Sequence, residues 1–244
     1  MRNRIDLSPN YSKKNRKLRN IKFVIIHYTG MQSEIESLNR LKDPKKKVSA
    51  HYLINRKGEI TKLVNERNTA WHAGKSRWKN FKNLNHYSIG IELVNKGHEF
   101  GYQKFTSIQI KSLINLCKNL KKKYKIKSEN FLGHSDIAPL RKVDPGEKFP
   151  WRKLSKYNLG FWYKKEVQKI KNQKDKKRNL FFKNIYKIGY RYFSLKQKMI
   201  NKDKKIIKAF QLKFLPKSVS GKLDQKTLQI SYYLASSYKI LKKS

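Results

Sequence analysis

The stretch FLGHSDIAPLRKVDPGEKFPW, residues 131–151, decides the fold and carries most of the chemistry of the chain. Glycine and proline recur along it, and both residues fix turns rather than extend helices or strands. Among them lie His134, Lys142 and Asp144, whose side chains can bind ligands or transfer protons. We therefore expect a rigid loop that holds these side chains in defined places.

Two residues of this loop are suited to binding a metal ion. Imidazole and carboxylate groups are zinc ligands, and a catalytic zinc has three protein ligands and one open position. His134 and Asp144 would supply two of them. The best candidate for the third is His27, which follows the apolar run of the segment IKFVIIHY, a pattern typical of a buried strand. A hydrogen-bonded structural role is the alternative for His27.

A second buried strand, SIGIELV at residues 88–94, contains an acidic residue. A carboxylate at Glu92 is costly among apolar neighbours unless it is paired or its pKa is raised. Because side chains alternate along a strand, Glu92 need only face away from Ile91 and Leu93. The strand pattern alone therefore leaves a functional and a structural role for Glu92 equally open.

Three further ring side chains lie near predicted strands. Trp71 and His72, in the loop AWHAG, could line a cleft and bind substrate, since an aromatic residue near glycine suits a sugar or peptide. A core position for Trp71 is equally compatible with the pattern. His51, within the predicted strand HYLIN, is expected to be structural or to orient a ligand.

The remaining pattern predicts alternating helices and strands. Residues 33–41 form an amphipathic helix with a serine cap, and residues 106–124 form the clearest helix, with one apolar stripe. Residues 49–64 are predicted to form two strands joined by a tight turn. A helix over residues 151–167 is expected to close the domain.

Five motifs occur in one order: VIIHYT, VSAHYLINRKGEI, AWHAG, SIGIELVN and GHSDIAPLRKVDPG. Together they resemble the zinc-dependent N-acetylmuramoyl-L-alanine amidases of the AmpD/AmiD type, which share a fold with peptidoglycan recognition proteins. The resemblance covers residues 21–151. It implies an α/β fold with a mixed central sheet flanked by helices, and one Zn²⁺ per chain bound by His27, His134 and Asp144.

The resemblance also implies the reaction. Glu92 matches the family's catalytic glutamate, and Lys142 matches the lysine that stabilises the oxyanion. The bond cleaved would be the amide between N-acetylmuramic acid, or its 1,6-anhydro form, and L-alanine of the stem peptide, in cell-wall turnover or recycling. The expected partners are therefore muropeptides. A non-catalytic peptidoglycan-binding protein of the same fold is the alternative.

The C-terminal part of the chain predicts a separate helical module. Residues 168–179 are charged and nearly free of apolar side chains, as in a linker. Three apolar-periodic segments follow, and AFQLKF with SGKLDQKTLQ resembles the three-helix peptidoglycan-binding module of AmiD-type amidases. We expect an N-terminal arm at residues 1–20, a catalytic domain at 21–167, this linker, and a helical domain at 180–244. A generic basic helical tail is the alternative.

The charge balance is extreme, with 60 Lys and Arg against 16 Asp and Glu and a formal net charge of +44. Such a charge attracts polyanions, so a basic nucleic-acid-binding protein is a second alternative. Abundant lysine, asparagine and isoleucine are also what an AT-rich coding sequence produces, and muropeptides are themselves rich in carboxylates. We therefore expect no dedicated nucleic-acid partner.

Redox state and location are only weakly constrained. The single cysteine, Cys117, excludes an intrachain disulfide. No apolar run of about 18 residues is present, so a membrane-spanning helix is not expected. The N-terminus lacks the apolar segment of a secretory signal. We expect a cytoplasmic monomer, with the periplasm or cell envelope as the alternative location.

Overall fold

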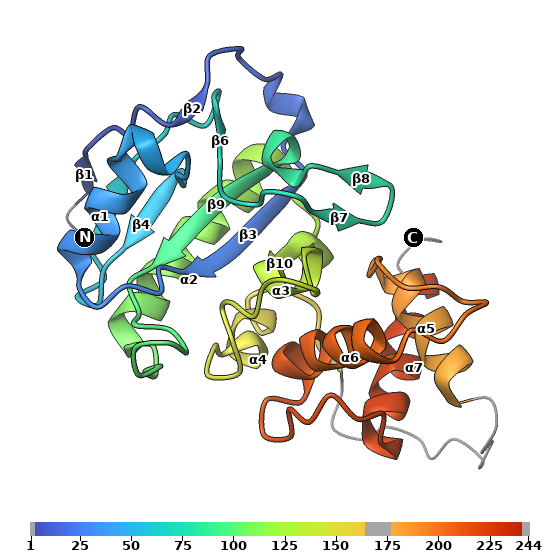
Figure 1. Ribbon diagram of the computed structural model, residues 1–244. Helices are drawn as coiled ribbons and strands as arrows, with labels where there is room; N and C mark the ends of the chain where they lie inside the picture. Colours follow the sequence, from blue (N-terminus) through green and yellow to red (C-terminus); the bar gives the residue numbers. More distant parts are fainter. Residues whose placement is uncertain (1–2, 164–176, 241–244) are drawn as a thin grey trace.

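The computed structural model describes residues 3–163 and 177–240 of the chain. Its centre is a six-stranded sheet with the strand order β1-β5-β4-β9-β3-β10 (Figure 1). The strands are β1 (Asn3–Ile5), β3 (Phe23–Tyr28), β4 (Tyr52–Ile54), β5 (Ile60–Lys62), β9 (Ser88–Leu93) and β10 (Phe131–Gly133). β10, β3, β9 and β4 pair in parallel, whereas β4 and β5 are antiparallel. The predicted mixed sheet is confirmed.

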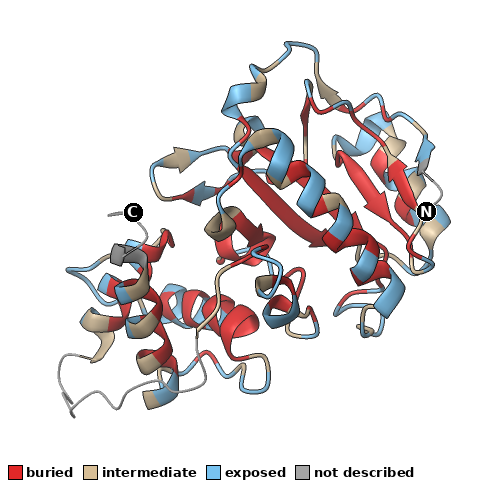
Figure 2. Cartoon of the chain, turned by 180° about the vertical axis from the view of Figure 1, so that it is seen from behind, coloured by how far each residue is buried: buried red, intermediate tan, exposed pale blue. Residues whose placement is uncertain are grey.

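The alternation of side chains along β3 divides the core between the two faces of the sheet. Val24 and Ile26 belong to the same apolar cluster as the inner face of helix α2 (Ser107–Tyr124), which crosses the sheet with its outer side exposed (Figure 2). Phe23 and Ile25 belong to a different cluster on the opposite face. Since His27 shares the parity of Phe23 and Ile25, its side chain lies on the face away from α2.

The two predicted helices with an apolar face form, and the first has the predicted serine cap. Helix α1 (Glu34–Lys42) begins after Ser33, whose hydroxyl accepts a hydrogen bond from the Glu36 amide at 3.1 Å. Helix α2 begins after Thr106, whose hydroxyl accepts from the Gln109 amide at 3.1 Å. These side chains satisfy backbone donors that the first helical turn leaves unpaired.

The closing helix is shorter than predicted. Helix α4 (Trp151–Ser155) ends early, and Asn158 and Gly160 then adopt positive φ angles of 58° and 123°, which an α-helix cannot contain. The prediction of helix over 151–167 is therefore wrong between residues 156 and 163. Residues 164–167 lie outside the described part of the chain.

The N-terminal residues join the sheet. β1 pairs in parallel with β5 at the edge of the sheet, and β2 (Tyr11–Ser12) pairs with β6 (Thr69–Ala70). Further short elements are the hairpin strands β7 (Arg77–Trp78) and β8 (Phe81–Lys82), and the 3-10 turns at Leu18–Asn20, Pro44–Lys46, Leu84–Tyr87 and Ser128–Asn130. The first residues of the predicted arm are thus one strand of the fold.

The C-terminal residues form three helices, α5 (Lys177–Ile188), α6 (Ile200–Phe214) and α7 (Gln225–Ile240), beside β10 and α3 (Figure 1). Phe181, Phe210 and Leu228 of these helices share one apolar cluster with Phe23 and Ile25 of β3. The helical module and that face of the sheet therefore have a continuous core. Most of the predicted linker, residues 168–176, lies outside the described residues, and α5 begins where the linker was expected to end. No helix in the described ranges is long and apolar enough to span a membrane.

Candidate active site

The pairing of three parallel strands brings the predicted site residues together. In β9 and β3, Glu92 lies opposite His27. In β10 and β3, Gly133 lies opposite Ile26, so His134, the next residue, begins helix α3 (His134–Ile137) beside His27. All three lie at the carboxyl ends of the strands, where α/β sheets commonly have their sites.

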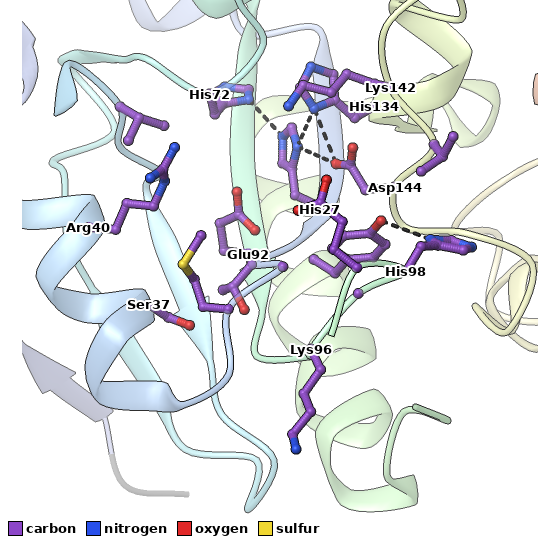
Figure 3. A pocket seen from close by; sticks show the side chains of 18 of the residues that line it. His27, Ser37, Arg40, His72, Glu92, Lys96, His98, His134, Lys142 and Asp144 are labelled. Atoms are coloured by element: carbon purple, nitrogen blue, oxygen red, sulfur yellow. Dashed lines mark hydrogen bonds and ion pairs between the residues drawn. The ribbon is translucent and has the colours of Figure 1, made fainter. Parts of the chain in front are cut away.

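His27, His134 and Asp144 converge on one point (Figure 3). The Nδ1 atoms of His27 and His134 are 3.0 Å apart, and Asp144 Oδ2 lies 3.0 Å from the first and 3.1 Å from the second. All three residues are buried. A tetrahedral ion with bonds of about 2.0 Å would place its ligand atoms about 3.3 Å apart. The three atoms therefore have nearly the spacing that one small metal ion requires.

A chain of hydrogen bonds assigns the tautomer of His27. The Ser88 hydroxyl donates to the Leu84 carbonyl at 2.6 Å, so its oxygen accepts from His72 Nε2 at 3.2 Å. His72 Nδ1 then carries no proton and accepts from His27 Nε2 at 3.0 Å. His27 Nδ1 is consequently an unprotonated lone pair that points at the convergence point.

The distal nitrogen of His134 has two neighbours. Its Nε2 lies 3.2 Å from the Ala73 carbonyl and 3.2 Å from Arg141 Nη2. When Nδ1 binds a cation, Nε2 carries the ring proton and donates it to the Ala73 carbonyl. Arg141 also donates to the Ala73 carbonyl and to the Lys75 carbonyl, which fixes that loop next to the imidazole. Such contacts to the distal nitrogen orient a histidine ligand.

The charge state of the cluster also suits a cation. Burial, followed by the neighbouring His134, lowers the pKa of His27 to about 4, so its imidazole is neutral at physiological pH. Burial alone would raise the pKa of Asp144, but His134 and His27 hold it well below its usual range, so the carboxylate is ionised. Two imidazole nitrogens and a carboxylate oxygen at these distances form a donor set for one small cation. The residues present therefore fit a metal ion.

Glu92 lies beside this cluster and faces the same cavity (Figure 3). Its neighbours Ile91 and Leu93 face α2. Because side chains alternate along a strand, the Glu92 side chain lies on the opposite face of the sheet. Its Oε2 atom is buried without a hydrogen-bond partner among the described residues. Burial, with a smaller contribution from the Asp144 carboxylate, raises the pKa of Glu92 to about 8. A carboxyl with such a pKa can accept and return a proton near neutral pH.

The cavity in front of the cluster has a volume of about 380 Å³. Lys142, two residues before Asp144, is exposed and lines this cavity together with Asp144. The ammonium group of Lys142 can therefore reach a ligand in the cavity.

The remaining predicted residues have different surroundings. His72 lines the cavity, but it is buried and its two ring nitrogens are occupied by His27 and Ser88. Trp71 is not among the residues lining the cavity, and its indole donates to the Ser12 hydroxyl at 3.1 Å. His51 is buried and accepts a hydrogen bond from the Gly90 amide at 3.0 Å, which joins neighbouring strands.

Glycine at position 90 makes room for His72. A Cβ atom at Gly90 would lie 2.3 Å from Cγ of the His72 ring, so the imidazole packs directly on the strand backbone. This close approach places His72 between His27 and Ser88. The sequence places Gly90 in a strand, but no local pattern indicates this role.

Several cavity residues were not anticipated from the sequence. Arg40 of α1 and Arg141 line the cavity, but in a chain with 60 Lys and Arg neither stands out. His98 also lines it, with Nδ1 2.9 Å from the Tyr28 hydroxyl and Nε2 3.0 Å from Glu147. His98 lies in a loop without periodicity, so no sequence pattern distinguished it.

Comparison with known proteins agrees with this geometry. The sequence profile of the family described as N-acetylmuramoyl-L-alanine amidase matches residues 17–147. N-acetylmuramoyl-L-alanine amidase AmiD of Escherichia coli (strain K12) is 36% identical over 243 residues, which cover 89% of this chain and 83% of AmiD. The 1,6-anhydro-N-acetylmuramyl-L-alanine amidase AmpD of Haemophilus influenzae is 44% identical over 108 residues, which cover 44% of this chain and 56% of AmpD.

Two solved structures are similar over nearly the whole chain. A complex of E. coli AmiD with the substrate anhydro-N-acetylmuramic acid-L-Ala-D-gamma-Glu-L-Lys superposes with a TM-score of 0.80 at 32% identity, covering 93% of this chain and 92% of AmiD. AmpDh3 from Pseudomonas aeruginosa, in complex with anhydromuramic pentapeptide, has a TM-score of 0.78 at 30% identity and covers 93% of this chain and 94% of that chain. The C-terminal helices are part of this likeness, since 93% of 244 residues cannot be reached without them. The chain therefore belongs to the N-acetylmuramoyl-L-alanine amidase family, as its motifs predicted.

Proposed function

We propose that the chain hydrolyses the amide bond between N-acetylmuramic acid, in its ordinary or 1,6-anhydro form, and L-alanine of muropeptide stem peptides. The observation that carries the proposal is the convergence of two imidazole nitrogens and one carboxylate oxygen beside a buried carboxyl group, Glu92, in one cavity. The two similar structures in complex with anhydromuramyl peptides support this class of substrate.

The proposed cofactor is one zinc ion held by His27 Nδ1, His134 Nδ1 and Asp144 Oδ2. Two neutral imidazoles and one carboxylate are a common donor set for zinc, and they leave the site with a net positive charge. When bound, zinc supplies Lewis acidity, which polarises the scissile carbonyl and activates water as a nucleophile.

The side chains around this site have distinct roles in the proposal. Glu92 accepts the proton of the attacking water and later donates it to the departing amine, for which its raised pKa is suited. Lys142 stabilises the negative charge that develops on the carbonyl oxygen. His72 holds His27 in the tautomer that leaves Nδ1 free. Trp71, away from the cavity, is not included in the proposed substrate site.

A defined anhydromuramyl tripeptide tests the proposal. The purified chain should release free tripeptide, detected by mass spectrometry, and release should stop with a zinc chelator and return on addition of Zn²⁺. The variant Glu92→Gln should bind zinc but release no peptide. If the wild-type chain binds zinc and the muropeptide without hydrolysing it, the non-catalytic binding protein is the better description.

The C-terminal helices are proposed to act as a peptidoglycan-binding-like module. Gln211, in the AFQLKF segment, donates to the Lys222 carbonyl at 2.9 Å and the Thr227 hydroxyl at 3.1 Å, and accepts from the Gly221 amide at 2.7 Å. These bonds build the loop between α6 and α7, which belongs to the segment resembling that module. Co-sedimentation with insoluble peptidoglycan, compared with cellulose as a control polymer, tests this role.

A monomeric state and a cytoplasmic location, with the cell envelope as the alternative, stay part of the proposal. A buried free thiol at Cys117 is compatible with either location. Sedimentation velocity of the purified chain and fractionation of the producing cells are the corresponding measurements.

A further inference from the structure

A buried ion pair connects the C-terminal helices to the segment that carries the metal ligands. Lys213 of α6 places Nζ 2.7 Å from Oδ2 of Asp136, and these residues are 5% and 1% exposed. The Tyr190 hydroxyl, after α5, donates to the other oxygen of Asp136. Both oxygens of this carboxylate are therefore bound by residues from the helical module.

Lys213 is an unusual residue for its position. Among residues whose burial the structure describes, it is the one buried lysine of a chain with 60 Lys and Arg. It lies between Leu212 and Phe214, and its Nζ is 4.1 Å from the centre of the Trp151 ring. Burying a charge in such surroundings is costly, and an apolar side chain would usually pack there at least as well. A specific contact therefore explains a lysine at this position better than packing does.

The contact is made with the turn that presents His134. Asp136 lies two residues after His134 in α3, and its Oδ2 atom also accepts the Gly133 amide at 2.8 Å. Within the same turn, the Ser135 amide donates to the Asp144 carbonyl at 2.9 Å. Fixing Asp136 thus fixes the backbone on both sides of His134 and the backbone of the second ligand, Asp144.

Trp151 joins the two parts on the other side. A Cβ atom at Gly133 would lie 2.7 Å from Pro145 and 3.3 Å from Trp151, so the strand end, the Asp144 segment and the indole are in close contact. Lys213 lies over the same indole and also donates to the Phe131 carbonyl at 3.3 Å. The ammonium group is therefore bonded to the beginning of β10 and to the turn after it.

We propose that the helical module is a positioning element of the metal site, in which Lys213 and Tyr190, acting through Asp136, hold the backbone that presents His134 and Asp144. The inference rests on the proposed zinc site, and it gives the module a role in addition to any contact with peptidoglycan. Zinc affinity should therefore depend on residues of α6 and of the segment after α5 that touch neither the ion nor the substrate.

The decisive experiment uses the full chain with the pair neutralised, Asp136→Asn together with Lys213→Met. Asparagine keeps an acceptor for the Gly133 amide, and no uncompensated charge is buried. The dissociation constant for Zn²⁺ is measured by competition with a chromophoric chelator, and the absorption spectrum of the Co²⁺-loaded protein reports ligand geometry. We expect zinc binding about 10-fold weaker or more, in the range found when groups that orient metal ligands are removed, and an altered cobalt spectrum.

A matched control removes a similar pair elsewhere in the module. Arg178 Nε lies 2.7 Å from Asp203 Oδ2, and both residues belong to the helical module. Arg178→Met with Asp203→Asn should lower stability but leave zinc affinity within about twofold of wild type. Equal zinc affinity in the wild type and the Asp136/Lys213 variant, or equal weakening in the control, would overturn the inference.

A milder pair of variants decides the matter if the double variant does not fold. Tyr190→Phe removes the hydroxyl that binds Asp136, whereas Tyr163→Phe removes one that donates to the Phe214 carbonyl at 3.1 Å. Only Tyr190→Phe should weaken zinc binding, and equal effects of the two would refute the positioning role. A wild-type chain that binds no zinc at all would instead contradict the proposed function.

Discussion

Replacing Glu92 by glutamine should stabilise the metal-free protein while it abolishes activity. Glu92 is buried, its Oε2 atom has no partner among the described residues, and its pKa is raised from 4.5 to about 8. Glutamine has nearly the same shape and no charge. The gain in the free energy of unfolding should therefore arise almost entirely because glutamate can ionise and glutamine cannot.

The sign and size of the effect follow from the pKa. Below pH 4.5 the carboxyl is protonated in both the folded and unfolded states, so it contributes no difference. Between pH 4.5 and about 8 the unfolded chain loses the proton while the folded chain retains it, so stability of the wild type falls as pH rises. A shift of roughly 3.5 units at about 1.4 kcal/mol per unit gives a ceiling of about 5 kcal/mol. Relaxation around the buried charge lowers this, and we expect about 2–4 kcal/mol.

The assay is urea unfolding, followed by tryptophan fluorescence, of both proteins in chelator at pH values from 5 to 9. The free energies of unfolding should agree at pH 5 and diverge up to pH 8–9, with Glu92→Gln the more stable. Glu99→Gln, at an exposed residue lining the same cavity, is the matched control for loss of a negative charge. Zinc should reduce the difference, because a nearby cation favours the ionised carboxylate. A stability difference that does not change with pH would refute the reasoning.

Three further predictions concern the cavity and its supports. Gly90→Ala should displace the His72 ring, because the new Cβ would lie 2.3 Å from it. The free energy of unfolding, measured by denaturation, should fall by about 1–3 kcal/mol. Zinc affinity, measured by chelator competition, should also fall. Lys142→Met should lower kcat by about 100-fold, measured by steady-state kinetics on a muramyl tripeptide. Zinc binding should change little, since the ammonium group is exposed in the cavity and is not a ligand. Trp71→Phe removes the hydrogen bond to Ser12 but no cavity wall, so stability should fall by about 1 kcal/mol while KM is unchanged, and an increased KM would restore Trp71 as a substrate contact.

Candidate residues of the site could be picked out from local sequence patterns, whereas the complete ligand set and the roles of Glu92 and Lys142 came from the resemblance to the amidase family. His27 and Glu92 lie in strands whose side chains alternate, so parity alone assigns them to a face. His134 and Asp144 lie in a segment whose glycine and proline residues restrict the backbone. Parallel pairing brings the ends of these strands to one edge of the sheet, and the register that places Glu92 opposite His27 is seen only in the structure.

Other features depend on contacts that no local pattern reports. Helix α4 ends at Ser155 although helix was predicted to residue 167, and Asn158 then adopts a positive φ. The side chain of Trp71 is directed by Ser12, a residue 59 positions away. Lys213 could not be recognised because lysine is common everywhere in the chain and its partner Asp136 is 77 positions away.

Several buried polar side chains of this fold lie at the site. The sheet face that carries Phe23 and Ile25 is apolar toward one end and polar toward the other, where His27, Glu92 and the His72 ring lie on it. Each polar group there is either part of the hydrogen-bonded histidine chain or faces the cavity. Glu92 faces the cavity, and its unpartnered oxygen and raised pKa cost stability in the folded chain. A nearby cation favours the ionised form of this group, and the carboxylate can then take a proton from water in the cavity. The residue that weakens the metal-free fold is therefore the one on which the proposed hydrolysis depends.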